Sequence, residues 1–193
     1  MLKHNRPLVL VVAGLDSSGG AGISADCITV HDNAAFALPC VTALTSQSLS
    51  KISMVVPTDE ALFEDTLKLA YEDSKAISAI KVGLISDDRL LKILLKYLDN
   101  EFKGIPVVWD PVLTGTAGDL HSVDLKAYLK DILKHTTIFT PNLNEALELA
   151  SWSKEDFKQK GVKALAQVFL DLGCQNVVIK GGHNIENTDA KDY

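Results

Sequence analysis

The chain has 193 residues, 47% of them hydrophobic and 23% charged, and its formal net charge is −6. A chain of this length can bury one sizeable core, so we expect a single domain over residues 1–183 and a polar tail at 184–193. The acidic balance and the lack of a basic run exclude nucleic acid and anionic membrane surfaces as expected partners.

The N-terminal segment and the cysteines indicate the compartment. The first apolar run, residues 8–13, is far shorter than the ~18 residues of a membrane span. Cys27, Cys40 and Cys174 are widely spaced and form no CxxC pair. We therefore expect a cytoplasmic protein with three buried, reduced thiols.

Short apolar, β-branched segments alternate along the chain with segments of helical spacing. The first kind predicts buried parallel strands at residues 8–13, 40–44, 79–84, 106–109, 137–140 and 176–180, with a further strand at 52–56 in an edge position or a small lid. The second kind predicts helices at residues 23–36, 60–74, 87–98, 122–133, 144–150 and 155–172. The alternation predicts an α/β fold, a three-layer α/β/α sandwich with a mostly parallel central sheet.

Four residues mark expected helix ends. Ser86 is a candidate N-cap for the helix at 87–98, and Ser153 with Asp156 resembles a capping box. Gly173 stands where a glycine commonly follows the last helical turn.

Glycine and polar residues follow most of the predicted strands, at residues 14–22, 45–47, 110–119, 141–145 and 180–183. In open α/β sheets, ligands bind beyond the carboxyl ends of the strands. We therefore expect these segments to form one site.

The glycine-rich segment 14–22 has three interpretations. As a phosphate-binding P-loop it fails, because Gly20 and Ala21 stand where lysine and a hydroxyl residue are needed. As a dinucleotide fingerprint it nearly fits, but the second strand ends in residues 45–47 without the ribose-binding acid. The third interpretation is a glycine turn that brings backbone close to a small ligand and places Asp26 on the first helix. A tight turn with no ligand explains the glycines equally well.

The later segments carry groups suited to phosphate and a divalent cation. Asp110 follows an apolar strand and could organise a cation or merely cap a turn, and residues 114–118 offer backbone and hydroxyl donors. Asn142 and Glu145, three apart at a helix start, could hold a hydrated magnesium ion or form a capping pair. Lys180 ends the last strand and could contact phosphate or be solvated. Together these groups match the needs of phosphoryl transfer.

Residues 13–26 closely resemble the opening of the hydroxymethylpyrimidine/phosphomethylpyrimidine kinases, members of the ribokinase-like superfamily. Further segments that resemble this family follow in the family's order, at 41–47, 81–84, 108–112, 140–145 and 178–183. The resemblance implies a ribokinase-like fold and a kinase of thiamin biosynthesis that uses ATP and Mg²⁺. Such an enzyme phosphorylates the hydroxymethyl group of an aminopyrimidine and then the monophosphate.

The resemblance also implies roles for individual residues. The pyrimidine would be surrounded by Gly14, Ala21, Asp26 and Gln47, with Leu84 and Val112 as apolar walls. The nucleotide and its phosphates would be bound by Asp110, Thr116, Asn142 and Lys180, and the metal by Glu145 and Asp110. A carboxylate and an amide suit the amino and ring-nitrogen edges of a pyrimidine.

The sequence departs from the family at two informative places. Leu84 stands where the family usually has methionine, a mild change in one pocket wall. Family members also continue into a Gly-Thr-Gly-Cys segment, whose amides bind the transferred phosphoryl group and whose cysteine activates the substrate hydroxyl. This sequence ends at Tyr193 without that segment. The resemblance therefore implies that the sequence is a kinase without its C-terminal part. It also implies that residues 1–193 contain no catalytic base, so that we expect these residues alone to be inactive or nearly so.

Other functions remain open at this point. Pyridoxal kinase is a related alternative, because pyridoxal also carries a hydroxymethyl group on a nitrogen heterocycle. A non-catalytic protein that binds a pyrimidine is an alternative of another class, and a dinucleotide-dependent oxidoreductase is disfavoured by the missing ribose acid. The expected partners are a small pyrimidine and ATP, and a homodimer is compatible with these features.

Overall fold

The computed structural model describes residues 6–73, 77–113, 123–181 and 192–193. Its seven strands form one sheet in the order β3-β2-β1-β4-β5-β6-β7. The strands are β1 (Leu8–Leu15), β2 (Phe36–Gln47), β3 (Ile52–Pro57), β4 (Ile77–Val82), β5 (Val107–Trp109), β6 (Ile138–Phe139) and β7 (Asn176–Val177). All neighbouring strands are parallel except β2 and β3, so β3 is an antiparallel edge strand. The predicted mostly parallel sheet is confirmed.

The described helices are α1 (Gly22–Asp32), α2 (Glu60–Asp73), α3 (Asp88–Asp99), α4 (Leu129–Leu133), α5 (Leu143–Ala150) and α6 (Lys154–Asp171). None of them is both long enough and apolar enough to cross a membrane. The helix expected at 23–36 is too long by several residues. Ala34 has a left-handed φ of 59°, which ends the helical path, and Phe36 already pairs with Leu8 in the sheet. The helix expected from residue 122 begins only at Leu129, and residue 122 lies outside the described ranges.

The helix caps follow the predictions with one exception. Asp87, not Ser86, caps α3, because its carboxylate accepts a hydrogen bond from the Arg89 N–H. Ser153 and Asp156 form the expected capping box of α6. Gly173 follows that helix with a φ of 118°, which only glycine adopts without strain.

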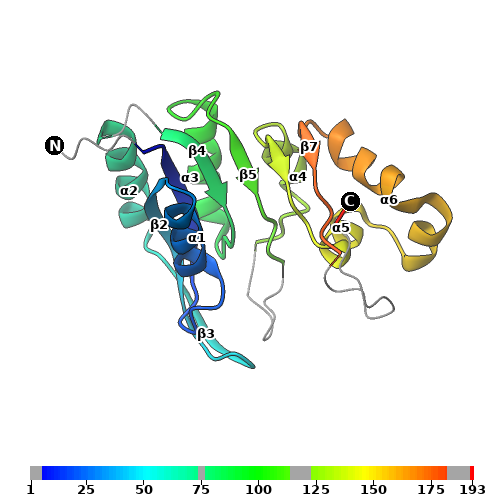
Figure 1. Cartoon of the computed structure of the whole chain (residues 1–193), viewed down its shortest axis with the longest axis horizontal. Helices are drawn as coiled ribbons and strands as arrows, with labels where there is room; N and C mark the ends of the chain where they lie inside the picture. The colour runs from blue at the N-terminus through cyan, green and yellow to red at the C-terminus, as the bar shows by residue number, and fades with distance from the viewer. Residues whose placement is uncertain (1–5, 74–76, 114–122, 182–191) are drawn as a thin grey trace.

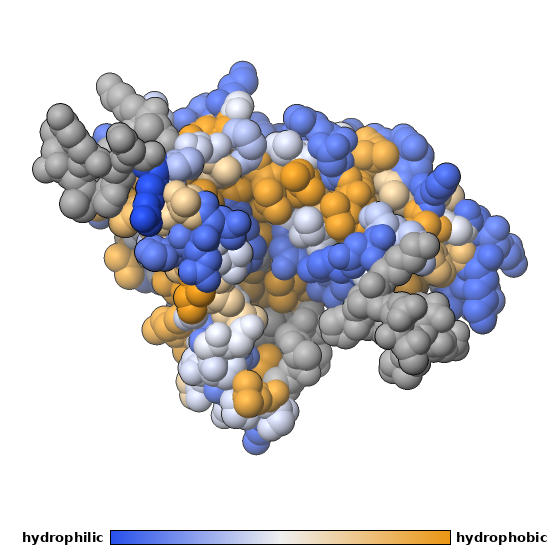
Figure 2. Space-filling view, viewed as in Figure 1, coloured by the Kyte–Doolittle hydropathy of each residue, from blue (hydrophilic) through white to orange (hydrophobic). Residues whose placement is uncertain are grey.

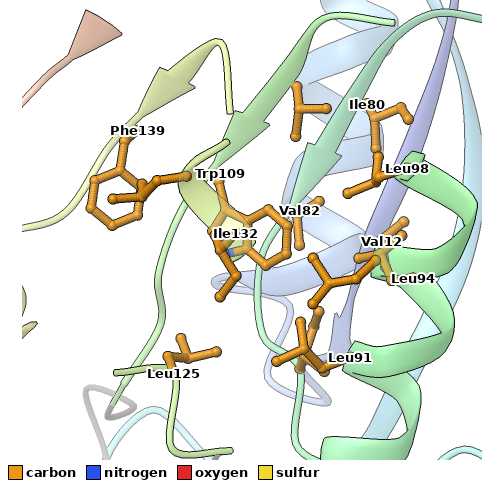
Figure 3. Packing of buried hydrophobic residues seen from close by; sticks show 14 of the residues in the cluster. Val12, Ile80, Val82, Leu91, Leu94, Leu98, Trp109, Leu125, Ile132 and Phe139 are labelled. Atoms are coloured by element: carbon orange, nitrogen blue, oxygen red, sulfur yellow. The ribbon is translucent and has the colours of Figure 1, made fainter. Parts of the chain in front are cut away.

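Helices cover both faces of the sheet, as predicted (Figure 1). Successive residues of a strand point to opposite faces. On one face, Val11 and Ala13 of β1 pack with Ile23 of α1. On the other face, Val12 packs in a larger core that also contains residues from all the other described helices. Figure 3 shows Leu91 and Leu94 of α3 reaching toward β1 and β4 in this core.

The two faces are covered to different extents. Among the described helices, only α1 contributes to the smaller core, where it packs on β1 and β2. Farther along the same face, Val108 and Ile138 are only half-buried, and Val178 is 36% exposed. Hydrophobic residues accordingly reach the surface of this face beyond α1 (Figure 2).

Candidate active site

A cavity of about 700 Å³ opens at the carboxyl ends of the central strands. Its lining includes every residue predicted to surround the pyrimidine, namely Gly14, Ala21, Asp26, Gln47, Leu84 and Val112. Three residues predicted for the nucleotide and metal line the same cavity, namely Asp110, Asn142 and Glu145. Lys180 reaches it through an ion pair with Asp110, and Thr116 lies outside the described residues. The fold therefore brings two predicted sets of residues to one cavity, which leaves their individual roles as predictions.

The glycine-rich segment forms a tight loop around the carboxylate of Asp16. This carboxylate accepts hydrogen bonds from the Ser18 N–H and hydroxyl, both at 2.7 Å, and from the Ala21 N–H at 2.9 Å. Gly22 begins α1 with a φ of +61°, and a Cβ there would lie only 2.3 Å from the Gly14 carbonyl oxygen. The loop is therefore the glycine turn of the third interpretation, with backbone placed close to the cavity.

Asp16 is a site residue that the sequence analysis missed. Its side chain is buried, which opposes ionisation, but hydrogen bonds from Gln47, Ser18 and Ala21 outweigh burial and lower the pKa of the carboxyl below 3.8. An aspartate followed two residues later by serine, in a glycine-rich stretch, is typical of turns in which the side chain caps its own loop. That signal was available, and it indicates a structural role in shaping the cavity.

Replacing Asp16 by asparagine is expected to lower the free energy of unfolding at neutral pH by about 1–2 kcal/mol, because a neutral amide is a weaker acceptor for these donors. The pKa of Asp16 is lower in the folded than in the unfolded protein, so its charge stabilises the fold above about pH 4. This contribution is lost as the pH falls through the folded-state pKa. Urea unfolding of both proteins from neutral pH down to about pH 3 should show the difference shrinking; a constant difference would contradict the assignment.

Two hydroxyl groups join chain segments that surround the cavity. The Ser17 hydroxyl donates to the Gln47 carbonyl at 3.0 Å and accepts from the Gln47 N–H at 2.8 Å. The buried Thr42 hydroxyl donates to the Leu84 carbonyl at 2.5 Å. These contacts hold the backbones of Gln47 and Leu84 in place, and both residues line the cavity.

Asp26 projects from α1 toward β4, where it meets a lysine that the sequence analysis did not assign. Its Oδ2 lies 2.5 Å from the Nζ of Lys81, and both side chains are largely buried. Lys81 also lines the cavity. The presence of a charged residue inside a strand of mostly apolar residues, β4, was the signal that could have identified it.

The opposite part of the cavity holds acidic groups and a second lysine. The Nζ of Lys180 lies 2.6 Å from Oδ1 of Asp110. Asn142 and Glu145 form a capping box, in which the Glu145 N–H donates to Asn142 Oδ1 at 2.9 Å and the Asn142 N–H donates to Glu145 Oε2 at 2.7 Å. The capping alternative for this pair is therefore present in the structure.

Glu145 is only 7% exposed. Burial raises the pKa of its carboxyl above 4.5, and the negative charge of Asp110 raises it further, whereas the Asn142 N–H and Lys180 act in the opposite direction. A cation placed between these two carboxylates would relieve their repulsion. Among the described residues, no three histidine, cysteine or acidic side chains gather into a closed metal site.

The three cysteines are unpaired and do not line the cavity. Burial raises the pKa of Cys40 to about 12 and that of Cys174 to about 11, so both stay protonated and unreactive at neutral pH. Cys27 is half-buried in α1, a partial departure from the expected burial.

Comparison with known proteins assigns the chain to a family. The family model described as phosphomethylpyrimidine kinase matches residues 16–193. The chain belongs to this phosphomethylpyrimidine kinase family. A hydroxymethylpyrimidine/phosphomethylpyrimidine kinase of Saccharomyces cerevisiae is 32% identical over 97% of this chain and 34% of its own length. The chain thus spans about a third of that yeast relative.

Solved structures of phosphomethylpyrimidine kinases and related enzymes share the fold. The phosphomethylpyrimidine kinase of Clostridium difficile superposes with a TM-score of 0.80 at 25% identity, covering 97% of this chain and 84% of that one. A Staphylococcus aureus pyridoxal kinase, in complex with AMP-PCP and pyridoxal, has a TM-score of 0.79 at 29% identity, covering 97% and 66%. The predicted ribokinase-like α/β fold is confirmed by these similarities.

Proposed function

We propose that the protein containing this chain phosphorylates 4-amino-5-hydroxymethyl-2-methylpyrimidine and its monophosphate, with ATP as the phosphoryl donor. The observation that carries the proposal is the placement of the Asp26 carboxylate and the Gln47 amide around one cavity whose lining also includes Asp110 and Glu145. Membership of the phosphomethylpyrimidine kinase family supports it.

The pyrimidine end of the cavity suits a flat heteroaromatic ring. Leu84 contacts Gly14 so closely that a Cβ on the glycine would lie 2.9 Å from a Leu84 methyl carbon. A glycine there leaves a thin slot beside an apolar wall, and Val112 supplies a second apolar side chain. Asp26 and Gln47 then offer an acceptor for the amino group and an amide for the ring nitrogen.

The phosphate end would bind the nucleotide and Mg²⁺. Lys180 supplies a positive charge for phosphate oxygens, and Asp110 and Glu145 supply carboxylate ligands. Two carboxylates together with substrate phosphates are a common way to bind Mg²⁺, so this pair fits the ion without a third protein ligand. When bound, the ion would neutralise charge on the transferred phosphoryl group.

The contribution of these residues to catalysis is positioning and charge stabilisation. Phosphoryl transfer requires the hydroxyl and the terminal phosphate to lie in line, with the developing charge neutralised. The backbone of the glycine-rich loop and Gln47 would orient the hydroxymethyl group, and Lys180 would hold the phosphate. None of the three cysteines lines the cavity. The expected lack of a catalytic base among residues 1–193, and the expected inactivity of these residues alone, stay predictions.

Pyridoxal is the second candidate substrate, favoured by the similarity to the pyridoxal kinase of S. aureus. Pyridoxal also carries a hydroxymethyl group beside a ring, but it has no amino group for the Asp26 carboxylate. The two substrates are therefore distinguished by the residues that would contact the amino and ring-nitrogen edge.

Calorimetric titration of the chain with the aminopyrimidine, pyridoxal and a nonhydrolysable ATP analogue tests the proposal. The aminopyrimidine should bind more tightly than pyridoxal. Replacing Gln47 by alanine should weaken aminopyrimidine binding about tenfold, the usual effect of losing one or two hydrogen bonds, and leave nucleotide binding unchanged.

The matched control is Gln167→Ala, which removes an amide that donates to Asp171 at 2.7 Å on the surface of α6. It should change neither affinity. Tighter binding of pyridoxal than of the aminopyrimidine would favour the second candidate. An equal loss of affinity for the aminopyrimidine and the nucleotide in Gln47→Ala would contradict the assignment of Gln47 to the pyrimidine.

A further inference from the structure

The ion pair between Lys81 and Asp26 lies at the base of the cavity, between strand β4 and helix α1. The Lys81 Nζ lies 2.5 Å from Asp26 Oδ2, and the two side chains are 23% and 21% exposed. A pair this short and this shielded from solvent restricts the carboxylate far more than an exposed ion pair would. Among the described residues, the Lys81 ammonium group donates to Oδ2 of Asp26, and no group donates to Oδ1 of Asp26.

Gly83 makes room for the lysine. A Cβ added at this position would lie 2.8 Å from the Lys81 Nζ and 3.2 Å from the Ala13 Cβ. The lysine side chain therefore crosses the space that any side chain at position 83 would occupy. Lys81, Gly83 and Asp26 all line the cavity.

We propose that Lys81 is a positioning residue for substrate recognition, which holds Asp26 by one carboxylate oxygen so that the other accepts the amino group of the pyrimidine. This inference rests on the proposed function and adds to it a determinant of amino-group specificity. An unrestrained aspartate on a helix can rotate about two side-chain bonds, and it would lose that freedom when the ligand binds. The ion pair with Lys81 removes most of that rotational freedom before the ligand binds.

The plain alternative is that the pair only attaches α1 to the sheet. This alternative predicts that removing Lys81 weakens the binding of every ligand of the cavity equally, because α1 as a whole would be held less firmly. The positioning role predicts a loss confined to ligands that carry the amino group. The two are separated by comparing 4-amino-5-hydroxymethyl-2-methylpyrimidine with 5-hydroxymethyl-2-methylpyrimidine, which lacks the amino group.

The experiment measures the dissociation constants of both compounds by calorimetry for the chain and for two variants. Lys81→Met removes the charge and keeps much of the length of the side chain. Gly83→Ala keeps the charge but displaces the ammonium group. In both variants the aminopyrimidine should bind about tenfold more weakly, as expected when a charge-assisted hydrogen bond is lost, and the amino-free compound should change less than about twofold.

Lys96→Met is the matched control, because Lys96 forms an exposed ion pair with Glu64 at 3.1 Å between α3 and α2. It should affect neither compound. If Lys81→Met fails to fold in thermal unfolding, Gly83→Ala carries the test. An equal loss of both compounds in the variants would overturn the positioning role while leaving the proposed function intact. Failure of the unmodified chain to bind the aminopyrimidine would overturn both.

Discussion

Replacing Gly22 by alanine is expected to eliminate measurable pyrimidine binding and to lower the free energy of unfolding by about 2–5 kcal/mol. Two physical effects add. The φ of +61° is a left-handed conformation that alanine adopts only with strain, and the new Cβ would overlap the Gly14 carbonyl oxygen at 2.3 Å. Backbone cannot move aside as a flexible side chain can, so the glycine-rich loop must open and the start of α1 must shift.

Gly104→Ala is the control for this substitution. Gly104 has a φ of +84°, but no atom lies within 4 Å of an added Cβ, and it does not line the cavity. This substitution should lower the free energy of unfolding only by the strain of the left-handed conformation, about 1–2 kcal/mol, and it should leave pyrimidine binding intact. Urea unfolding and calorimetry on both variants measure the effects. If the two variants lose stability and pyrimidine affinity equally, the close approach of Gly22 to Gly14 has no special importance.

Replacing Lys180 by methionine is expected to weaken binding of a nucleotide with Mg²⁺ by about 10–100-fold, the range of a lost charge-assisted hydrogen bond. The lysine lies 2.6 Å from Asp110, and without it the carboxylates of Asp110 and Glu145 would face the phosphates unopposed. Nucleotide binding should consequently become more dependent on the Mg²⁺ concentration in the variant.

Lys160→Met provides the comparison, because Lys160 also forms an ion pair, with Asp156 at 2.8 Å, but on the exposed surface of α6. Exposed pairs of this kind contribute little to stability because solvent screens them, and neither Lys160 nor Asp156 lines the cavity. Titrations with a nonhydrolysable ATP analogue at several Mg²⁺ concentrations compare the two variants. If the Lys180→Met variant binds the nucleotide as tightly as the unmodified chain, Lys180 and Asp110 have only a structural role.

Local sequence signals were sufficient where one segment decides its own structure. Asp110 could be placed at a strand end because an apolar run precedes it and a proline follows it. The capping box at Ser153 and the glycine after α6 depend on residues within a few positions of each other. The end of α1 was misplaced, because the apolar residues 34–36 continue the helical pattern although Phe36 pairs with Leu8 in the sheet.

The sequence by itself determined the alternation of strands and helices, and through it the edge of the sheet at which polar loops meet. It did so because hydrophobic periodicity reports which residues must be buried, and parallel strands bring their carboxyl ends together. Only the tertiary structure decided the pairing of Asp26 with Lys81, 55 residues away, and of Asp110 with Lys180, 70 residues away. Such pairs form between side chains that chain folding brings together, so their distances depend on the packing of whole elements and no local pattern records them.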